Sequence, residues 1–352
     1  MALDINVIQQ GINDQPIRLV KDERRFRFFT NVVFGKAVPY GGNTAQDYLR
    51  LDSEFRSAGL TEEAEKGLDP HRVNYNNPFK SDAVAGLYYN DEDFVDSNMA
   101  RERLVGESIS NPMSQDARLL ALLGMKSDRL FDTYGNSLEK KLANLALTGK
   151  IMTRNGGENV FPVVSGLLSM DGSKLISDPI ACLGAAMTTF AKKGGLMPKM
   201  LVLNPSDGIK LMTSSKMQEV MDKRRIESGQ VKYGAIDENG LSSLGYVDVA
   251  GVGYLDVYSY YGAYQEGSSY NYLIPQGKAL LLPIGGIGFI GHCGVFAGKE
   301  YASPKIAAEH YKYVYSPEGP LPHKTYVQLQ YAPCPVITEL TSYGVLKDIP
   351  TT

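Results

Sequence analysis

The chain has 352 residues; 43% are hydrophobic and 21% are charged, with 36 basic and 39 acidic side chains and a formal net charge of -3. This composition is typical of globular proteins and excludes wholesale disorder and collagen-like repeats, while the length favours two domains or one large elaborated domain. Nucleic-acid binding through bulk charge is excluded too, because contacts to phosphates need a clustered basic excess.

Cysteine usage and hydropathy indicate a soluble protein in a reducing compartment. The three cysteines, Cys182, Cys293 and Cys334, are an odd number without close spacing, so no disulfide framework is expected. The first residues lack the basic and apolar regions of a secretory signal. The longest apolar run, residues 279–291, contains proline and several glycines and is too short and too broken to cross a bilayer. We therefore expect no membrane partner.

Two N-terminal regions are not expected to form compact structure by themselves. Residues 1–40 are predicted to be an arm, and its mixed charge run is typical of a solvated edge, although it would also suit an acidic patch on a neighbouring chain. Residues 41–88 are polar and punctuated by glycine, asparagine and proline. A stretch this long is either disordered or an extended loop that something else orders.

The strongest helical pattern covers residues 114–149. Ser114 can cap its start, Gly149 can end it, and leucines recur between them at helical spacing. Such a rod, roughly 50 Å long, usually lies across a sheet or joins two regions. A coiled coil is the competing interpretation, but the heptad pattern is not sustained. The acidic run just before it, residues 91–96, lacks the pattern of a calcium loop and is expected to be a solvated turn.

Shorter helices and strands follow from about residue 172. Asp178 and Pro179 are expected to begin one helix and Asn204 another, with a buried strand at 199–203 between them. Further on, the hydrophobic period changes to two residues, which predicts strands. These strands are expected near residues 246–249, 255–258, 272–274, 280–282 and 326–331. The whole pattern predicts an α+β fold without internal repeats.

No motif for catalysis or cofactor binding is convincing. Gly286, Gly288 and Gly291 match a dinucleotide-binding pattern, but no helix follows them, so turns or bulges between strands are the better interpretation. The histidines and cysteines lack the spacing of a metal site. We therefore expect no catalytic, cofactor-binding or metal site and no enzyme activity; an enzyme with a dispersed active site is kept as an alternative.

The 22 tyrosines point instead to contact surfaces. Tyrosine gives a large, fairly rigid contact area with a polar tip, which suits protein interfaces, although tyrosines near residues 258–272 could simply pack across a hairpin. With the arm and the long loop, they indicate a subunit of a larger assembly. The side chains expected at inter-subunit contacts are Arg24, Arg25, Arg27, Tyr40, Tyr48, Tyr75, Tyr261, Tyr264 and Tyr270.

The order of these elements resembles the lambda-like major capsid proteins of tailed phages, the E family. The resemblance spans about residues 114–340 and is carried by the joint order of landmarks, none of which is specific alone. The landmarks are a helix that ends in ALTGK (146–150), a helix opened by Asp178-Pro179, the segments DVYS (256–259) and ALLLP (279–283), and a late strand that runs into Ala332-Pro333.

The resemblance implies a Hong Kong 97-like capsid fold. The regions it implies are an N-terminal arm (1–40), an extended loop that overlaps a neighbour (41–88), a peripheral domain with a spine helix at 114–149 (89–171), an axial domain (172–300) and a return to the peripheral sheet (301–352). Residues 260–272 would then form a loop near the axis of a capsomer.

On this resemblance the chain would be a structural subunit of the virion. Copies would assemble in the host bacterial cytoplasm, as hexamers and pentamers, into a procapsid that matures to the icosahedral shell around phage DNA, without sequence-specific DNA binding. Scaffold and portal proteins would be partners, with a decoration protein as an optional one. Another virion component, such as a tail or decoration protein, is the alternative; a weak helical signal at 114–149 would favour it.

Overall fold

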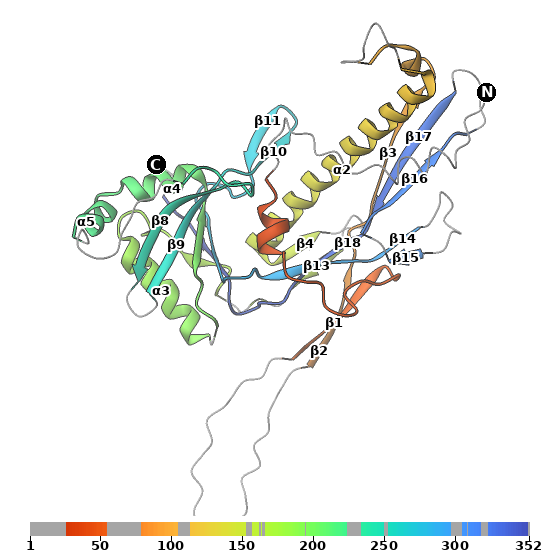
Figure 1. Cartoon of the computed structure of the whole chain (residues 1–352). Coiled ribbons are helices and arrows are strands. Elements are labelled where there is room, and N and C mark those ends of the chain that lie inside the picture. The colour runs from red at the N-terminus through yellow and green to blue at the C-terminus, as the bar shows by residue number, and fades with distance from the viewer. Residues whose placement is uncertain are drawn as a thin grey trace, which may run out of the picture.

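The computed structural model describes residues 26–54, 79–104, 113–152, 157–161, 163, 166–193, 195–223, 234–249, 253–296, 305–307, 309–317 and 323–350. Helices and strands are mixed along the chain and gather into two sheets with helices packed on them, joined by a central region of short strands (Figure 1). The predicted α+β class is therefore confirmed. Arg24, Arg25 and Tyr75 lie outside the described residues.

The longest element is helix α2 (Gln115–Thr148), with 34 residues. Ser114 Oγ accepts a hydrogen bond from the N–H of Ala117 at its start, and Gly149 ends it in the left-handed conformation, at φ 70°. Only glycine adopts that conformation at little cost, and its N–H donates to Leu145 O. These two ends confirm the helix predicted for residues 114–149, and the rod is about 50 Å long.

One face of a three-stranded antiparallel sheet packs against α2 (Figure 1). Leu119 and Leu123 of the helix lie on Val95, Val314 and Val327 of the strands. The strands, in spatial order, are β16 (Tyr311–Tyr315), β17 (Lys324–Tyr331) and β3 (Tyr89–Asp96), and a short helix, η2 (Met99–Arg101), follows β3.

The prediction of a solvated turn at residues 91–96 is wrong, because these residues lie in β3. Asp93 Oδ2 lies 2.9 Å from Lys126 Nζ on α2, so a lysine compensates the carboxylate on the helix-facing side. β3 is an edge strand of its sheet, and charged side chains on an edge discourage pairing with other chains. An acidic strand was therefore mistaken for a loop.

The second sheet has six strands and carries the predicted helices. Asp178 and Asn204 cap α3 and α4 as expected, each accepting a hydrogen bond from a backbone N–H, and a proline follows each cap. The helices are α3 (Pro179–Lys192), α4 (Pro205–Thr213) and α5 (Ser215–Lys223). The strands, in spatial order, are β6 (Met170–Asp171), β19 (Gly344–Lys347), β12 (Ala279–Leu282), β7 (Met200–Leu203), β9 (Gly253–Tyr260) and β8 (Leu241–Val249).

Residues 301–352 were expected to return to the sheet under α2, but not all of them do. Strand β19 pairs with β12 and β6 in the six-stranded sheet instead. Leu346 is fully buried there, and the backbone at Gly344 lies so close to Met170 and Phe190 that a side chain would not fit. Local packing against α3 thus decides the place of this strand, and nothing in its four-residue pattern indicates which sheet it joins.

Two-stranded pairs complete the fold. The pairs are β1 (Tyr48–Glu54) with β2 (Phe79–Ala85), β4 (Lys150–Met152) with β5 (Glu158–Val160), β10 (Ala263–Glu266) with β11 (Ser269–Tyr272), β13 (Gly288–His292) with β18 (Pro333–Ile337), and β14 (Gly294–Phe296) with β15 (Lys305–Ala307). β1 and β2 fall inside the stretch 41–88 that was expected to be irregular. They form a hairpin that points away from the rest of the molecule (Figure 1).

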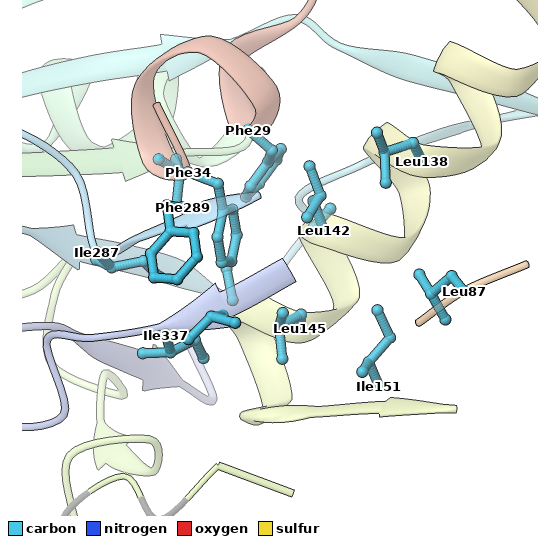
Figure 2. Packing of buried hydrophobic residues seen from close by; sticks show 14 of the residues in the cluster. Phe29, Phe34, Leu87, Leu138, Leu142, Leu145, Ile151, Ile287, Phe289 and Ile337 are labelled. Carbon is cyan, nitrogen blue, oxygen red and sulfur yellow. The ribbon is translucent and has the colours of Figure 1, made fainter. Parts of the chain in front are cut away.

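A hydrophobic core lies where the N-terminal segment, α2 and the β13–β18 pair meet. Figure 2 shows Phe29 and Phe34 on one side and Leu142 and Leu145 of α2 on the other, with Phe289 beside the phenylalanines. All five are at most 4% exposed. At about 25 cal/mol per Å² of apolar area removed from water, this core stabilises the junction between segments that are far apart in sequence.

Turns or bulges were expected at the three glycines of the glycine-rich stretch, and the structure has a turn at one of them. Gly286 has φ 81° and turns the chain before β13, but Gly288 and Gly291 lie inside that strand. A side chain on Gly288 would collide with the backbone of Val336, and one on Gly291 with that of Gly42. These glycines therefore permit close backbone packing, which is the other common use of glycine in a strand.

Truncating Leu142 should destabilise the protein much more than truncating an exposed residue of the same helix. Leu142 is 0% exposed, so Leu142→Ala leaves a cavity and should lower the free energy of unfolding by about 2–5 kcal/mol. Met125 is 53% exposed, and Met125→Ala should stay within about 0.5 kcal/mol of wild type. Denaturant titration measures both, and equal effects would contradict the assigned burial.

Candidate functional site

The junction between the arm, the long helix and the six-stranded sheet is held by one buried carboxylate. Glu139 lies in the middle of α2 and is 2% exposed. Its Oε1 accepts hydrogen bonds from the N–H of Phe29 (2.7 Å) and the hydroxyl of Tyr260 (3.2 Å). Its Oε2 accepts from the N–H and the hydroxyl of Thr30, at 3.1 and 2.6 Å. One side chain thus joins three segments.

The partner of Glu139 in the arm is a single π-helical turn, η1 (Phe29–Val33). The N–H groups at the start of any helix have no partner inside it, and the side chain of the N-cap residue, Phe28, cannot cap this one. Glu139 satisfies the N–H groups of Phe29 and Thr30 from another helix. A negative charge is also favoured at this end of a helix.

Burial makes this arrangement sensitive to protonation. Desolvation raises the pKa of Glu139, and the hydrogen bonds from Thr30 and Phe29 oppose the rise. Burial, and after it the neighbouring carboxylate, also raise the pKa of Tyr260, which therefore stays a hydroxyl and a donor. A buried carboxylate that accepts four hydrogen bonds is tolerable, whereas the same group without them would be strongly destabilising.

Aromatic packing surrounds the carboxylate and keeps water away from it. The ring of Tyr260 lies 5.0 Å from that of Phe28 and 5.7 Å from that of Phe29, measured between centroids. All three side chains are fully buried. Tyr260 therefore does not belong to an exposed loop near an axis, as the resemblance had implied; it ends β9 and anchors the sheet to the arm.

Arg27, an expected inter-subunit residue, contacts α2 of its own chain. Its Nη1 donates to Asn136 Oδ1 at 2.9 Å. A Cβ at Gly135 would lie 2.6 Å from the guanidinium Nη2, so the arginine lies directly on the helix backbone at this glycine. Gly135 thus permits the close approach of the Arg27 side chain to the helix.

Among the described residues, the base of the β1–β2 hairpin is attached to the rest of the chain by hydrogen bonds and buried side chains. The Asn159 side chain of β5 donates to Ala85 O (2.8 Å) and accepts from Ala85 N–H (3.3 Å), and Leu87 N–H donates to Pro333 O (2.8 Å). Leu49 and Val84 are the buried hydrophobic residues of this base. Further out, the two strands pair only with each other (Figure 1). An isolated two-stranded hairpin is marginally stable in water, so this one gains from a surface to lie on.

The predicted contact tyrosines differ in exposure. Tyr40 is fully exposed at the tip of a turn closed by a hydrogen bond from Gly42 N–H to Pro39 O (2.9 Å). Tyr270, on the β10–β11 hairpin, is 75% exposed. Tyr48 and Tyr261 are half-buried. Of these, Tyr40 and Tyr270 are the side chains most available to a partner.

Tyr264 is engaged within the chain. Lys140 Nζ of α2 lies 4.2 Å from the centroid of its ring and 3.1 Å from Glu266 Oε1. The β10–β11 hairpin is therefore held against α2 by a cation–π contact and a surface ion pair, each weak when exposed to solvent. Both interpretations of the tyrosine cluster apply in part: Tyr260 and Tyr264 pack internally, and Tyr270 faces solvent.

Sequence reasoning missed Glu139 and Asn159. Glu139 stands in the segment LEKK, where two following lysines suggest a solvated helix face, and no periodic signal marks it as buried. Asn159 lies in a three-residue strand between loops.

Chemistry-bearing groups elsewhere do not converge. Within the residues that the structure describes, no three histidine, cysteine, aspartate or glutamate side chains are grouped so as to hold a metal ion. His292 and His310 are half-buried, burial lowers the pKa of both, and the ring of His310 packs on Phe131. Among the described helices, none is both long and apolar enough to span a membrane.

No protein-family model and no curated protein matches this sequence. Solved structures do match. The capsid protein of a prophage in Escherichia coli CFT073 is 16% identical and superposes with a TM-score of 0.64 over 99% of both chains. The capsid subunit of cyanophage A-1(L) is 12% identical and covers 96% of both chains with a TM-score of 0.49.

The chain has a Hong Kong 97-like capsid fold. The superposition on the prophage protein carries this assignment, because it extends over nearly the whole length of both chains. At a sequence identity of 16%, the structural similarity establishes the fold and does not by itself establish the function.

Removing the Glu139 carboxylate should destabilise the protein by several kcal/mol. Glu139→Ala leaves unpaired buried donors on two segments, the arm and β9, and we expect a loss of about 3–5 kcal/mol in the free energy of unfolding. Glu139→Gln keeps the volume and one accepting oxygen and should lose less. As a control, Glu158→Gln removes a carboxylate from an exposed ion pair and should change stability by less than about 1 kcal/mol. Equal losses for all three variants would contradict the buried junction.

The free energy of unfolding should depend on pH in the way that the raised pKa of Glu139 predicts. Because its pKa is raised on folding, the folded protein takes up a proton more readily than the unfolded chain. The resulting stabilisation is fully present below the unfolded pKa, about 4.3, and is lost as the pH rises through the raised folded value. Wild type should therefore gain stability relative to Glu139→Gln as the pH falls in denaturant titrations. A difference that shrinks on acidification would contradict the raised pKa.

Proposed function

We propose that this chain is the major subunit of a tailed-phage capsid shell and that it is closest in kind to the lambda-like E family. The observation that carries the proposal is the full-length superposition on a prophage capsid protein. Beyond its base the hairpin has no further partner strand among the described residues, and this and the solvent-exposed Tyr40 and Tyr270 agree with a protein that completes its packing against copies of itself.

The division of the chain follows from this proposal. The arm is residues 1–40, and 41–88 is the extended loop, which contains β1 and β2. The peripheral domain is 89–171 with α2 as its spine, joined by most of 301–352. The axial domain is 172–300, to which β19 adds a strand from the C-terminal region.

The geometry suits a subunit in which forces at its contact surfaces are passed to a common core. Glu139 ties the arm and the six-stranded sheet to the middle of a rigid helix, so a force on the hairpin or the arm reaches one shared core. In a symmetric shell each surface patch meets its counterpart on the next copy, so many modest contacts act together. Stability of the shell then needs no single strong interface.

The proposed partners follow from the same role. Copies of the chain would form hexamers and pentamers, assemble in the host bacterial cytoplasm with scaffold and portal proteins, and become part of the virion. A net charge of -3 fits a wall that encloses DNA without binding it tightly. The chain would have a structural role rather than an enzymatic one. Helix α2 argues against the alternative of a mostly β tail subunit.

Electron microscopy of the purified full chain at high concentration, alone and with a scaffold encoded beside it, tests this proposal. Closed shells of uniform size, or rings of five and six copies, are expected. Small single particles under every condition would contradict the role as a shell subunit.

Substituting the exposed tyrosines should reduce assembly without unfolding the subunit. Tyr40→Ser and Tyr270→Ser should change the free energy of unfolding by less than about 0.5 kcal/mol but lower the yield of closed particles roughly tenfold, because each loss is repeated around the shell. Tyr254→Ser, at a 51% exposed residue outside the predicted set, is the control. Equal yields for all variants would show that these two tyrosines are not contact residues.

The loop 41–88 should be protected by neighbours. Limited proteolysis should cleave it first in the free subunit and slowly in the shell, because its strands pair only with each other beyond the base. The rate of loss of the intact chain, followed by mass spectrometry, measures this. Equal cleavage rates in both states would contradict the overlap of this loop with a neighbouring subunit.

A further inference from the structure

One asparagine on the β4–β5 pair points inward, towards the base of the projecting hairpin. Asn159 of β5 lies directly opposite Ile151 of β4. Residues opposite each other in an antiparallel pair project from the same face, and Ile151 is 0% exposed. The other face carries Met152 and Val160, which are 47% and 50% exposed. The alternation of the two strands therefore turns the amide of Asn159 into the molecule.

The β4–β5 pair is attached to the C-terminal end of α2. β4 begins at Lys150, one residue after Gly149, which ends the helix. Phe161 N–H donates to Gly149 O at 3.0 Å, and Lys141 Nζ donates to Met152 O at 2.9 Å. The covalent link and these two hydrogen bonds hold the pair of strands at the end of the helix.

The amide of Asn159 takes the place of a neighbouring strand at the edge of β2. Its Nδ2 donates to Ala85 O at 2.8 Å, and its Oδ1 accepts from Ala85 N–H at 3.3 Å. Two residues opposite each other in an antiparallel sheet exchange the same two hydrogen bonds. On its other side Ala85 pairs with Tyr48 of β1, so β2 is flanked there by a strand and by this side chain. Among side chains, only those of asparagine and glutamine combine a donor and an acceptor in the geometry of a peptide group.

A second set of hydrogen bonds holds the hairpin where its strands leave the body. Gly294 N–H donates to Gln46 O at 2.8 Å, and Leu87 N–H donates to Pro333 O at 2.8 Å. These two points lie just before β1 and just after β2, and they fix where the hairpin begins. Ala85 lies further out along β2, so its bonds to Asn159 act on the tilt of the hairpin. The apolar contacts at the base resist tilting but are non-directional, whereas hydrogen bonds are directional.

We propose that Asn159 is the positioning residue that sets the direction of the β1–β2 hairpin relative to α2. With both hydrogen bonds made, the hairpin, the β4–β5 pair and the end of the helix move together. Without them, the hairpin stays folded on its base but tilts over a wider range. In the proposed shell, this direction decides where the hairpin meets the next copy. That consequence rests on the proposed function, whereas the direction itself is a property of the isolated chain.

Two substitutions separate the hydrogen bonds from the bulk of the side chain. Asn159→Leu keeps the approximate shape and removes both bonds. Asn159→Asp keeps an acceptor for Ala85 N–H but places a carboxylate oxygen against Ala85 O, where the donor was. Asn136→Ala is the matched control, because it removes an asparagine that is hydrogen-bonded to Arg27 on another part of α2.

Pulsed electron–electron double resonance on the full-length chain measures the direction of the hairpin. Nitroxide labels at Ala83→Cys in β2 and Met125→Cys in α2, both at exposed residues, report the distance between hairpin and helix. The three native cysteines are at most 6% exposed, and the chain without the two added cysteines measures their background. Asn159→Leu and Asn159→Asp should widen the distance distribution at least about twofold, whereas Asn136→Ala should leave it unchanged.

Amide hydrogen exchange gives an independent readout of the same contact. The amide of Ala85 should exchange at least about tenfold faster in Asn159→Leu than in wild type, because its N–H has lost its acceptor. Asn159→Asp should retain more protection there, since a carboxylate oxygen can still accept from this N–H. The amide of Leu87, which is bonded to Pro333, should exchange at the wild-type rate in both variants.

Unchanged distance distributions in both Asn159 variants would overturn the proposal. Equal acceleration at Ala85 and Leu87 would also overturn it, because the whole base would then open. In the assembly assay, Asn159→Leu should give open or irregular particles where wild type gives closed shells, and uniform closed shells from this variant would contradict the consequence for the shell. A wild-type chain that forms no shells would contradict the proposed function, while the measurements on the isolated chain would still decide the role of Asn159.

Discussion

The architecture depends on one buried carboxylate. A long helix such as α2 has one narrow apolar face. Along most of its length, this face can pack against one sheet only. Glu139 changes this at the middle of the rod, where it accepts hydrogen bonds from the start of η1 and from Tyr260 at the end of β9. The cost of burying a charge is offset only if all three segments stay in place. The carboxylate therefore makes the arm, the helix and the six-stranded sheet interdependent, and Phe28, Phe29 and Tyr260 pack around that point.

The molecule has a well-packed interior around this junction, whereas the β1–β2 hairpin and two tyrosines project into solvent. Two large hydrophobic clusters, one at the junction and one between the six-stranded sheet and α3, hold the body together. The β1–β2 hairpin has only its base in the first cluster, through Leu49 and Val84. Tyr40 and Tyr270 expose large aromatic side chains to solvent. On the proposed role in a shell, these side chains would be available to neighbouring copies.

Local signals explain how much of the fold could be predicted from the sequence. The ends of α2, α3 and α4 follow from capping residues and prolines, which act within a few residues. Strands β9 and β17 follow from alternation, and β12 from a short run of apolar residues. β3 was missed because an acidic edge strand has the composition of a loop, and β19 because a four-residue strand does not specify its sheet. Glu139 could not be found because its partners lie about 110 and 121 residues away. The resemblance was useful because it concerned the order of elements, which survives when such contacts change.

Hydrogen–deuterium exchange of the wild-type chain and Glu139→Ala, under conditions where both are folded, examines the junction most directly. If the carboxylate holds the three segments together, its loss should accelerate exchange of the Phe29 and Thr30 amides and of the end of β9 by at least about tenfold. Exchange in the first turns of α2 and in β17 should not change. Uniform acceleration across the chain, or no acceleration at Phe29 and Thr30, would contradict the central role of Glu139.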